Sequence, residues 1–303
     1  FRRVLFRSHN HNLKFNGPTR LKEALVHSQN MVSIRILDDI GIDYAVDFVT
    51  HFGFQKANLP RTLSLALGSL SVSPMDLTAA YAVFANGGYK IEPFLIDRIT
   101  NGDGKVLLQA KPSYVCNQCG DKNINPTNLA PRVIPEDVAF LMNSALVDVI
   151  QRGTAQEARV LNHKDIAGKT GTTNEQVDAW FAGYSPDLAV TAWVGYDTPH
   201  PLHEYAAKLA LPLWIDFMKV ALSGKPEREM KQPANVVTVR INPDSGLVAS
   251  PNQTNSIPEY FRESEVPSAE DGSAPLHIEN SQDLENSPES NPEQTMENQE
   301  SLF

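Results

Sequence analysis

Apolar side chains recur at helical spacing in six stretches of the chain, most of them bounded by residues that start or stop helices. The clearest stretch runs from Pro74 to Asn86, with Ser73 in the capping position, proline first in the helix and Gly87-Gly88 after its end. Its apolar residues lie three and four positions apart, as on one buried helix face. The same pattern predicts helices at residues 19–26, 31–37, 41–53, 135–150 and 206–222.

Apolar and aromatic runs predict three strands that lie close together in the sequence, at residues 166–173, 179–184 and 189–196. Residues 185–188, Ser-Pro-Asp-Leu, supply good turn chemistry between the last two. We therefore expect three adjacent strands of an antiparallel sheet. The helix after them contains Pro212, which is expected either to kink it or to start its second half.

Two hairpins are also predicted from turn residues between short apolar runs. One pairs residues 89–99 with 106–108 around Asn101-Gly102-Asp103-Gly104. The other pairs residues 236–241 with 247–249 around a turn at residues 242–246. Helices packed with antiparallel strands make the expected fold class α+β.

The acidic charge of the chain is confined to its end. The formal net charge is −10, yet residues 263–303 hold eleven acidic residues and no Lys or Arg, so the rest of the chain is nearly neutral. That stretch, rich in Glu, Ser, Asn and Pro, buries too little apolar surface to offset its ordering entropy, which predicts a disordered tail. The near-neutral body lacks the clustered basic face that nucleic acid binding requires.

Composition divides the chain further. Residues 1–8 form a basic, apolar octapeptide that differs in character from the rest of the chain, and we interpret it as a foreign segment derived from a sequencing adapter; an edge strand or a basic arm is the alternative. Residues 9–230 are expected to form the main domain, 231–262 a small β-hairpin extension and 263–303 the acidic tail. No run reaches the roughly eighteen apolar residues of a spanning helix, and no signal peptide is visible.

The strongest chemical motif is Gly168-Lys169-Thr170-Gly171-Thr172-Thr173. A phosphate-binding loop would need a glycine where His163 stands, so that interpretation fails on spacing. The run instead matches the K-T-G element of serine β-lactamases and penicillin-binding proteins. Lysine places a positive charge beside a nucleophile and a substrate carboxylate, and the threonines offer hydroxyls to that carboxylate. Glycine lets a substrate backbone lie alongside an edge strand.

The second motif is Ser28-Gln29-Asn30, which matches the S-x-N element of the same proteins. Serine can relay a proton, and asparagine can donate to a substrate amide while it accepts from a lysine. Taken alone, the tripeptide is better explained as a helix-terminal serine followed by a turn asparagine. Its weight comes from order and context, with S-x-N first and K-T-G far downstream.

Longer stretches around these two motifs carry a family resemblance. They are residues 24–33, residues 74–88, residues 169–173 together with 178–184, and residues 193–196. Together they resemble the transpeptidase domain of the class A high-molecular-mass penicillin-binding proteins of Gram-negative bacteria. The resemblance covers residues 9–261, and Leu302-Phe303 is also similar to the end of that subfamily.

The resemblance implies a serine β-lactamase/DD-transpeptidase-like fold, truncated on its N-terminal side, and peptidoglycan cross-linking. In that family a serine attacks the penultimate D-Ala carbonyl of a stem peptide, and an amine of a neighbouring stem peptide, or water, resolves the acyl-enzyme. Ser28 would be the proton relay, Asn30 a ligand of the substrate amide and Lys169 the electrostatic partner. The substrate carboxylate and acyl chain would be held by Thr170, Gly171, Thr172 and Thr173.

The implied partners are stem peptides, as D-Ala-D-Ala donor and amine acceptor, and β-lactam antibiotics, which mimic D-Ala-D-Ala. An outer-membrane lipoprotein activator is a further candidate partner. No cofactor and no metal are expected. The family's membrane anchor would place the parent protein in the bacterial inner membrane, with this part of it in the periplasm.

One departure from the family pattern limits what this chain can do. The family's nucleophile is the serine of an S-x-x-K element, and no serine here has a lysine three positions later. Thr19-Arg20-Leu21-Lys22 has the spacing but lies directly before S-x-N, in a different context. The nucleophile is therefore expected upstream of this chain, together with the anchor, a glycosyltransferase domain and the start of the transpeptidase domain. The chain as given is expected to be inactive.

Two other interpretations, and the state of the cysteines, stay open. A serine β-lactamase would need E-x-x-L-N between the motifs, and residues 157–162 have one residue too many and lie just before Lys169. A non-catalytic wall-binding scaffold of the same fold is the alternative to an enzyme, and the upstream sequence distinguishes them. Cys116 and Cys119 lie in a polar loop, where a short-range disulfide or two free thiols are expected rather than a zinc site.

Overall fold

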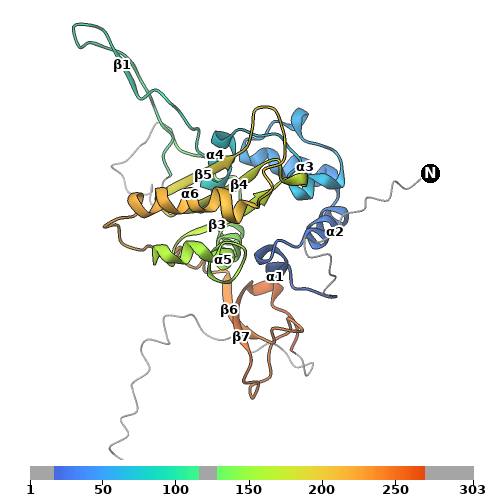
Figure 1. Ribbon diagram of the computed structural model, residues 1–303. Helices are drawn as coiled ribbons and strands as arrows, with labels where there is room; N and C mark the ends of the chain where they lie inside the picture. Colours follow the sequence, from blue (N-terminus) through green and yellow to red (C-terminus); the bar gives the residue numbers. More distant parts are fainter. Residues whose placement is uncertain (1–16, 116–127, 270–303) are drawn as a thin grey trace, which may run out of the picture. The chain divides into compact units, whose positions relative to one another are not determined.

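The computed structural model describes residues 17–115 and 128–269. The predictions for residues 1–8, for Cys116 and Cys119 and for most of the acidic tail therefore lie outside the described residues. The chain divides into two compact units, Phe1–Pro233 and Ala234–Phe303. Figure 1 shows their elements, and each unit is described by itself.

The centre of the first unit is a three-stranded antiparallel sheet in the order β3-β4-β5. Its strands are β3 (Ala167–Thr172), β4 (Ala179–Ser185) and β5 (Leu188–Val194). This confirms the predicted sheet, with a tight turn at Pro186-Asp187 between β4 and β5. Lys169 lies opposite Ala182, and Gly171 lies opposite Trp180. Within the described residues β3 pairs with β4 alone, so its other edge is free of strand partners.

Helices cover both faces of this sheet. On one face α6 (Ala206–Ala221) packs through the buried Trp214, whose ring lies 4.9 Å from that of Phe181. Pro212 lies inside this helix, which continues through it. On the other face α4 (Pro74–Ala85) and α5 (Glu136–Arg152) enclose Tyr184 together with Ala167 and Leu146. Alternation along the strands explains the two cores, because successive side chains point to opposite faces.

The N-terminal part of the unit is helical, as predicted. It contains α1 (Leu21–Val26), α2 (Asn30–Ile40) and α3 (Ile42–Val49), and after them the short 3₁₀ helices η1 (Thr50–Phe52), η2 (Lys56–Asn58) and η3 (Leu63–Leu67). The predicted boundaries of α4 also hold. The Ser73 side chain accepts a hydrogen bond from the Asp76 amide at 3.1 Å, and Gly87 and Gly88 take positive φ values of 80° and 106° after the helix. Further 3₁₀ helices are η4 (Gln156–Leu161), η5 (Asn174–Gln176) and η6 (Glu263–Glu265).

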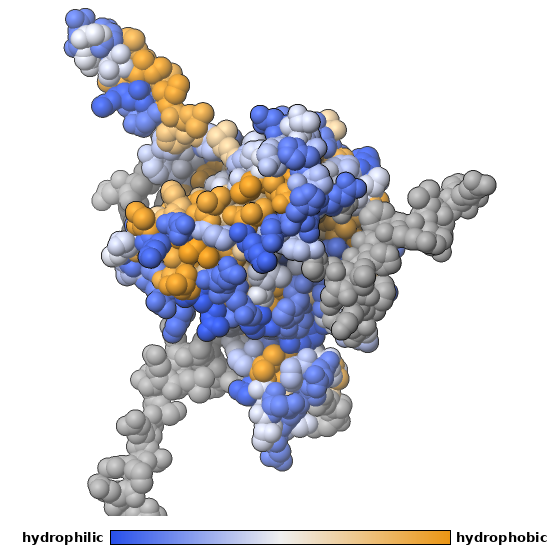
Figure 2. Space-filling view, viewed as in Figure 1, coloured by the Kyte–Doolittle hydropathy of each residue, from blue (hydrophilic) through white to orange (hydrophobic). Residues whose placement is uncertain are grey.

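The first predicted hairpin exists, but its leading strand was predicted far too long. The ribbon consists of β1 (Arg98–Thr100) and β2 (Val106–Gln109), and residues 90–97 are not strand. Pro93 explains the difference, because it lacks the amide that a paired strand donates. The ribbon's apolar residues are exposed, Leu107 by 63% and Leu108 by 48%, and Figure 2 shows them along its length below a polar tip.

The second unit contains a hairpin whose second strand differs from the predicted one. β6 (Val236–Ile241) pairs with β7 (Ile257–Arg262), whereas residues 247–249 contribute only isolated bridges, from Val248 to Ile241 and to Ala269. Pro251 comes just after the short run 247–249 and prevents it from extending as a strand. The later run supplies six residues, which pair with the full length of β6.

Helices and antiparallel strands together make the fold α+β, as the sequence predicted. No helix within residues 17–115 and 128–269 is long and apolar enough to cross a membrane.

Candidate active site

The predicted lysine and serine of the two motifs meet at the edge of the sheet. Lys169, on β3, places its Nζ 2.8 Å from Oγ of Ser28, which lies just after α1. The same ammonium donates to the Thr170 carbonyl at 2.9 Å and, more weakly, to Oγ1 of Thr170 at 3.4 Å. Two residues that lie 141 positions apart in sequence are thus in direct hydrogen-bond contact.

The environment of Lys169 changes its protonation. Burial lowers the pKa of the Lys169 ammonium from 10.5 to about 8, because desolvation disfavours the charged form. Lys169 makes no ion pair in the part of the chain that the structure describes, so no carboxylate there offsets this cost. A pKa near 8 leaves roughly a tenth of these side chains neutral at pH 7. Lys169 can therefore give a proton to Ser28 and take one back at modest cost.

Ser28 is held in an unusual backbone conformation by the end of α1. The Gln29 amide donates to the Ala24 carbonyl at 2.8 Å, and the Ser28 amide donates to the Leu25 carbonyl at 3.1 Å. These two bonds form a Schellman motif, in which the residue after the C-cap, C′, is left-handed and usually glycine. Ser28 occupies that position with a φ of 53°. A strained residue at a predicted site is common where function requires the side chain.

Asn30, the third residue of the S-x-N motif, is placed differently from Ser28. Asn30 is the first residue of α2, and Gln29 occupies the capping position before it. The hydrogen bonds of Lys169 go to Ser28 and Thr170 and none goes to Asn30. The structure therefore brings Ser28 and Lys169 together, and Asn30 lies two residues further along the chain, at the start of α2.

A network of charged side chains fixes α1 against α5. Arg152, at the end of α5, donates to Glu23 on α1 at 2.7 Å and to Asp148 one turn back at 2.9 Å. Lys22 on α1 forms an ion pair with Asp148 on α5 at 3.1 Å and donates a hydrogen bond to the Ser144 hydroxyl at 3.0 Å. The hydrogen bond from Arg152 holds the pKa of the Glu23 carboxyl below its usual value. Because Ser28 lies directly after α1, this network also positions the Ser28 hydroxyl.

The remaining residues of the K-T-G run have distinct surroundings. Oγ1 of Thr172 accepts a hydrogen bond at 3.1 Å from the amide of Ala206, the first residue of α6. Oγ1 of Thr173 accepts from the Asp178 amide at 2.8 Å, which closes the loop between β3 and β4. A Cβ on Gly171 would lie in van der Waals contact with the Trp180 Cβ, at 3.4 Å.

Sequence reasoning missed the residue that contacts Thr170. The hydroxyls of Thr154 and Thr170 lie 2.8 Å apart, and the Thr154 amide donates to the Val26 carbonyl of α1 at 3.3 Å. Thr154 lies just after α5 in a Gly-Thr pair, and helix-terminal glycines are so common that the pair carried no chemical indication.

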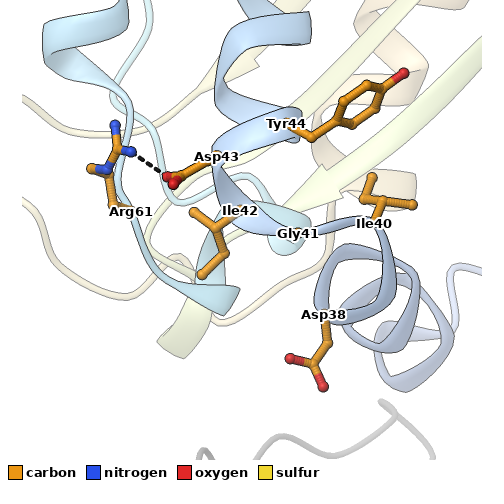
Figure 3. Close-up of a pocket in the computed structure, with 7 residues that line it drawn as sticks. All are labelled: Asp38, Ile40, Gly41, Ile42, Asp43, Tyr44 and Arg61. Carbon is orange, nitrogen blue, oxygen red and sulfur yellow. Dashed lines mark hydrogen bonds and ion pairs between the residues drawn. The ribbon is translucent and has the colours of Figure 1, made fainter.

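A separate depression lies at the junction of α2 and α3. Figure 3 shows it lined by Asp38, Ile40, Gly41, Ile42, Asp43, Tyr44 and Arg61, with Arg61 paired to Asp43. None of the predicted site residues lines this depression. Among residues 17–115 and 128–269, no three His, Cys, Asp or Glu side chains converge as metal ligands would.

Comparison with known proteins identifies the family. Residues 2–219 match the family described as "Penicillin binding protein transpeptidase domain". The chain is 40% identical over 299 residues to penicillin-binding protein 1A of Pseudomonas aeruginosa, covering 87% of this chain and 36% of that protein. It is 35% identical over 282 residues to penicillin-binding protein 1A of Vibrio cholerae, covering 82% of this chain and 34% of that one.

Solved structures agree. The crystal structure of penicillin-binding protein 1A from Haemophilus influenzae superposes with a TM-score of 0.78 at 37% identity, covering 86% of this chain and 42% of that one. The fold is thus that of penicillin-binding transpeptidase domains, as the motifs had indicated. The chain spans about a third of the length of these Pseudomonas and Vibrio relatives. The chain belongs to the penicillin-binding protein transpeptidase family and is similar to the penicillin-binding proteins 1A of Gram-negative bacteria.

Proposed function

We propose that this chain is the C-terminal part of a serine DD-transpeptidase domain that cross-links peptidoglycan by acyl transfer from D-Ala-D-Ala. The observation that carries the proposal is the 2.8 Å contact between Lys169 and Ser28 within a member of this family. The contact supplies a proton donor and its relay at the free edge of β3. The nucleophile is the serine of an S-x-x-K element in the part of the parent polypeptide that precedes this chain.

The proposed proton path runs through Ser28. When the acyl-enzyme forms, the lysine of the S-x-x-K element takes the proton of the attacking serine. The leaving D-Ala amine takes the Ser28 hydroxyl proton, and Lys169 returns a proton to Ser28. The lowered pKa of Lys169 favours this transfer, because less free energy is needed to remove its proton. When an amine of a second stem peptide resolves the acyl-enzyme, the same path carries the proton back. Asn30 is the proposed ligand of the substrate amide.

The free edge of β3 is the proposed binding surface for the stem peptide. A peptide backbone can lie along a sheet edge and form main-chain hydrogen bonds with it. Gly171 carries no side chain that would hinder that close approach. The hydroxyls of Thr170, Thr172 and Thr173 are the proposed donors to the terminal carboxylate and acyl chain. The Thr172 hydroxyl accepts from Ala206 and keeps its own proton for donation.

The parent protein is proposed to be a bifunctional peptidoglycan synthase. It would carry a glycosyltransferase domain and an anchor in the bacterial inner membrane, with the transpeptidase domain in the periplasm. Resolution of the acyl-enzyme by water would give carboxypeptidase activity, and β-lactams would trap it. An outer-membrane lipoprotein is the proposed activator. The partial coverage of the Pseudomonas and Vibrio relatives supports a longer parent.

Labelling with a fluorescent penicillin tests the proposal. The parent protein is expected to label stoichiometrically, and replacing its S-x-x-K serine by alanine is expected to abolish labelling. The 303-residue chain is expected not to label, because no serine in it belongs to an S-x-x-K element. Labelling of the chain itself would contradict the assignment of the nucleophile. A folded parent that binds peptidoglycan without labelling would instead identify a non-catalytic scaffold.

A further inference from the structure

Three consecutive residues at the end of α5 contact α1, which precedes the S-x-N motif, and β3, which carries the K-T-G motif. We propose that Thr154 is a positioning residue of the transpeptidase site, whose hydroxyl donates to Thr170 and so directs the Thr170 hydroxyl toward the substrate carboxylate. This inference rests on the proposed function and adds to it a residue outside the S-x-N and K-T-G motifs. Together, Arg152, Gly153 and Thr154 form what we call the clamp.

The clamp lies close against α1. Arg152 forms its ion pair with Glu23, and Gly153 approaches α1 so closely that a Cβ on it would lie 2.4 Å from the Val26 carbonyl oxygen. Any larger residue at position 153 would therefore move α1 away. The Thr154 amide completes the contact with its bond to the same carbonyl at 3.3 Å. The position of Thr154 is thus fixed relative to the helix that precedes Ser28.

The clamp also reaches β3 through one side chain. Oγ1 of Thr154 lies 2.8 Å from Oγ1 of Thr170, and the Lys169 ammonium lies 3.4 Å from the same Thr170 oxygen. If both neighbours donate to Thr170, the Thr170 proton remains for a third group. A substrate carboxylate accepts hydrogen bonds and donates none when ionised, so it needs such a proton. Thr154 therefore controls which way Thr170 donates without touching the substrate itself.

Penicillin acylation of the parent protein tests this role. Thr154→Val keeps the shape of the side chain and removes the hydroxyl, so the noncovalent dissociation constant of a penicillin should rise about tenfold, the equivalent of one hydrogen bond. The acylation rate constant at saturation should change less than threefold. Thr154→Ser should restore binding, because serine keeps the hydroxyl. Against a penicillin methyl ester, which lacks the anionic carboxylate, Thr154→Val should have no effect.

A matched control comes from the same sheet. Thr78 on α4 and Thr191 on β5 form another hydroxyl pair at 2.8 Å, partly buried like the first. Thr78→Val removes this hydrogen bond, together with the one from the Thr78 hydroxyl to the Pro74 carbonyl, and should leave the dissociation constant within twofold. Equal effects of Thr78→Val and Thr154→Val would overturn the proposal, as would an equal effect of Thr154→Val on the acid and its ester. If Thr154→Val does not fold, Thr154→Ala takes its place.

A measurement on the 303-residue chain separates this proposal from the proposed function. If the parent protein does not react with penicillin, the proposed function fails, yet the Thr154–Thr170 contact can still be tested. The NMR resonances of the Lys169 side chain, which faces Thr170, should shift in Thr154→Val and stay unchanged in Thr78→Val and Thr154→Ser. Unchanged Lys169 resonances in Thr154→Val would overturn the positioning role.

Discussion

Ser28 combines a strained backbone with the contact on which the proposed chemistry depends. Its left-handed conformation is the one that glycine adopts without cost at the end of a helix. A residue with a Cβ loses roughly 1–2 kcal/mol in this conformation. Serine at position 28 therefore lowers the stability of the folded state but places a hydroxyl against Lys169. Such a loss of stability is typical of functional positions.

The strain predicts a difference between two variants that both lack the hydroxyl. Ser28→Gly should be more stable than Ser28→Ala by about 1 kcal/mol, because only alanine keeps the Cβ. Urea unfolding of both variants measures the difference. The same pair at Ser33, inside α2, should show the opposite order, since glycine destabilises a helix interior. Equal stabilities at position 28 would remove the argument for strain.

The lowered pKa of Lys169 predicts a pH dependence of stability. The folded value is about 8 and the unfolded value 10.5, so between these pH values the unfolded state binds more protons. The free energy of unfolding of the protein therefore rises with pH through this window as Lys169 loses its proton. The cost of burying the charged form of Lys169 is largest below pH 8. Lys169→Met should be more stable than the natural chain at pH 7, with the advantage shrinking toward pH 9.5.

Urea unfolding at pH 7, 8 and 9.5 measures this advantage. Comparing the two proteins at each pH cancels the titration of all other groups. An advantage of Lys169→Met that stays constant over the whole range would show that Lys169 titrates outside it.

The motif residues could be predicted from sequence, and the residue that couples them could not. Lys169 and Ser28 belong to short sequence motifs, and the residue types in those motifs indicate their chemistry. Thr154 belongs to no pattern, because its importance comes from a contact with Thr170 across the space between a helix end and a strand. Likewise, no periodicity indicates that Gly153 must be small, since the atom that it approaches is a carbonyl of α1.

At the scale of elements, the charged network between α1 and α5 holds the S-x-N segment in place. Glu23 receives hydrogen bonds from Arg152 at 2.7 Å and from Arg20 at 2.9 Å, and its side chain is 21% exposed. Salt screens such a partly buried pair less than a fully exposed one. The helix of only six residues needs such tertiary contacts, because isolated short helices are unstable in water.

Glu23→Gln should lower the free energy of unfolding by about 1 kcal/mol at pH 7, since a neutral amide pairs less strongly with Arg152. The folded pKa of Glu23 lies below 4.5, so its contribution is complete above that pH and is lost as pH falls through the folded value. The two proteins should therefore converge in acid. Glu136→Gln, at an exposed pair with Arg132, should change stability by less than about 0.3 kcal/mol. No difference between the two substitutions would refute this role for Glu23.

Elements with strong local patterns could be predicted, as could the pairing of strands joined by short connections, whereas the partner of β6 could not. The caps and the helical spacing fixed the boundaries of α4 to within one residue. Of the strand predicted over residues 89–99, residues 90–97 do not form a strand, because Pro93 lacks the amide that a paired strand donates. For β6, alternation identified the strand correctly but not its partner, since the pattern of one strand does not specify which other strand pairs with it.

At the scale of the whole molecule, the predicted site residues all lie in the first unit. Ser28 and Asn30 come from its N-terminal helices, and residues 169–173 come from the central sheet. The overall α+β class could be predicted from helices alternating with closely spaced strands, whose short connections favour antiparallel pairing. The domain boundaries at residues 230 and 262 stay predictions.

The separation of 141 residues between Ser28 and Lys169 has a consequence for how the protein is made. A ribosome that adds roughly 5–20 residues per second needs on the order of ten seconds to synthesise that interval. During this interval β3 has not yet been synthesised, and for most of the interval α5 has not been synthesised either. Val26 therefore cannot yet pack into the hydrophobic core that it occupies in the folded protein. Closing this long loop, rather than forming the local helices, is the step that completes the site. The nascent chain therefore spends its synthesis with an unfinished N-terminal segment, open to chaperones and proteases.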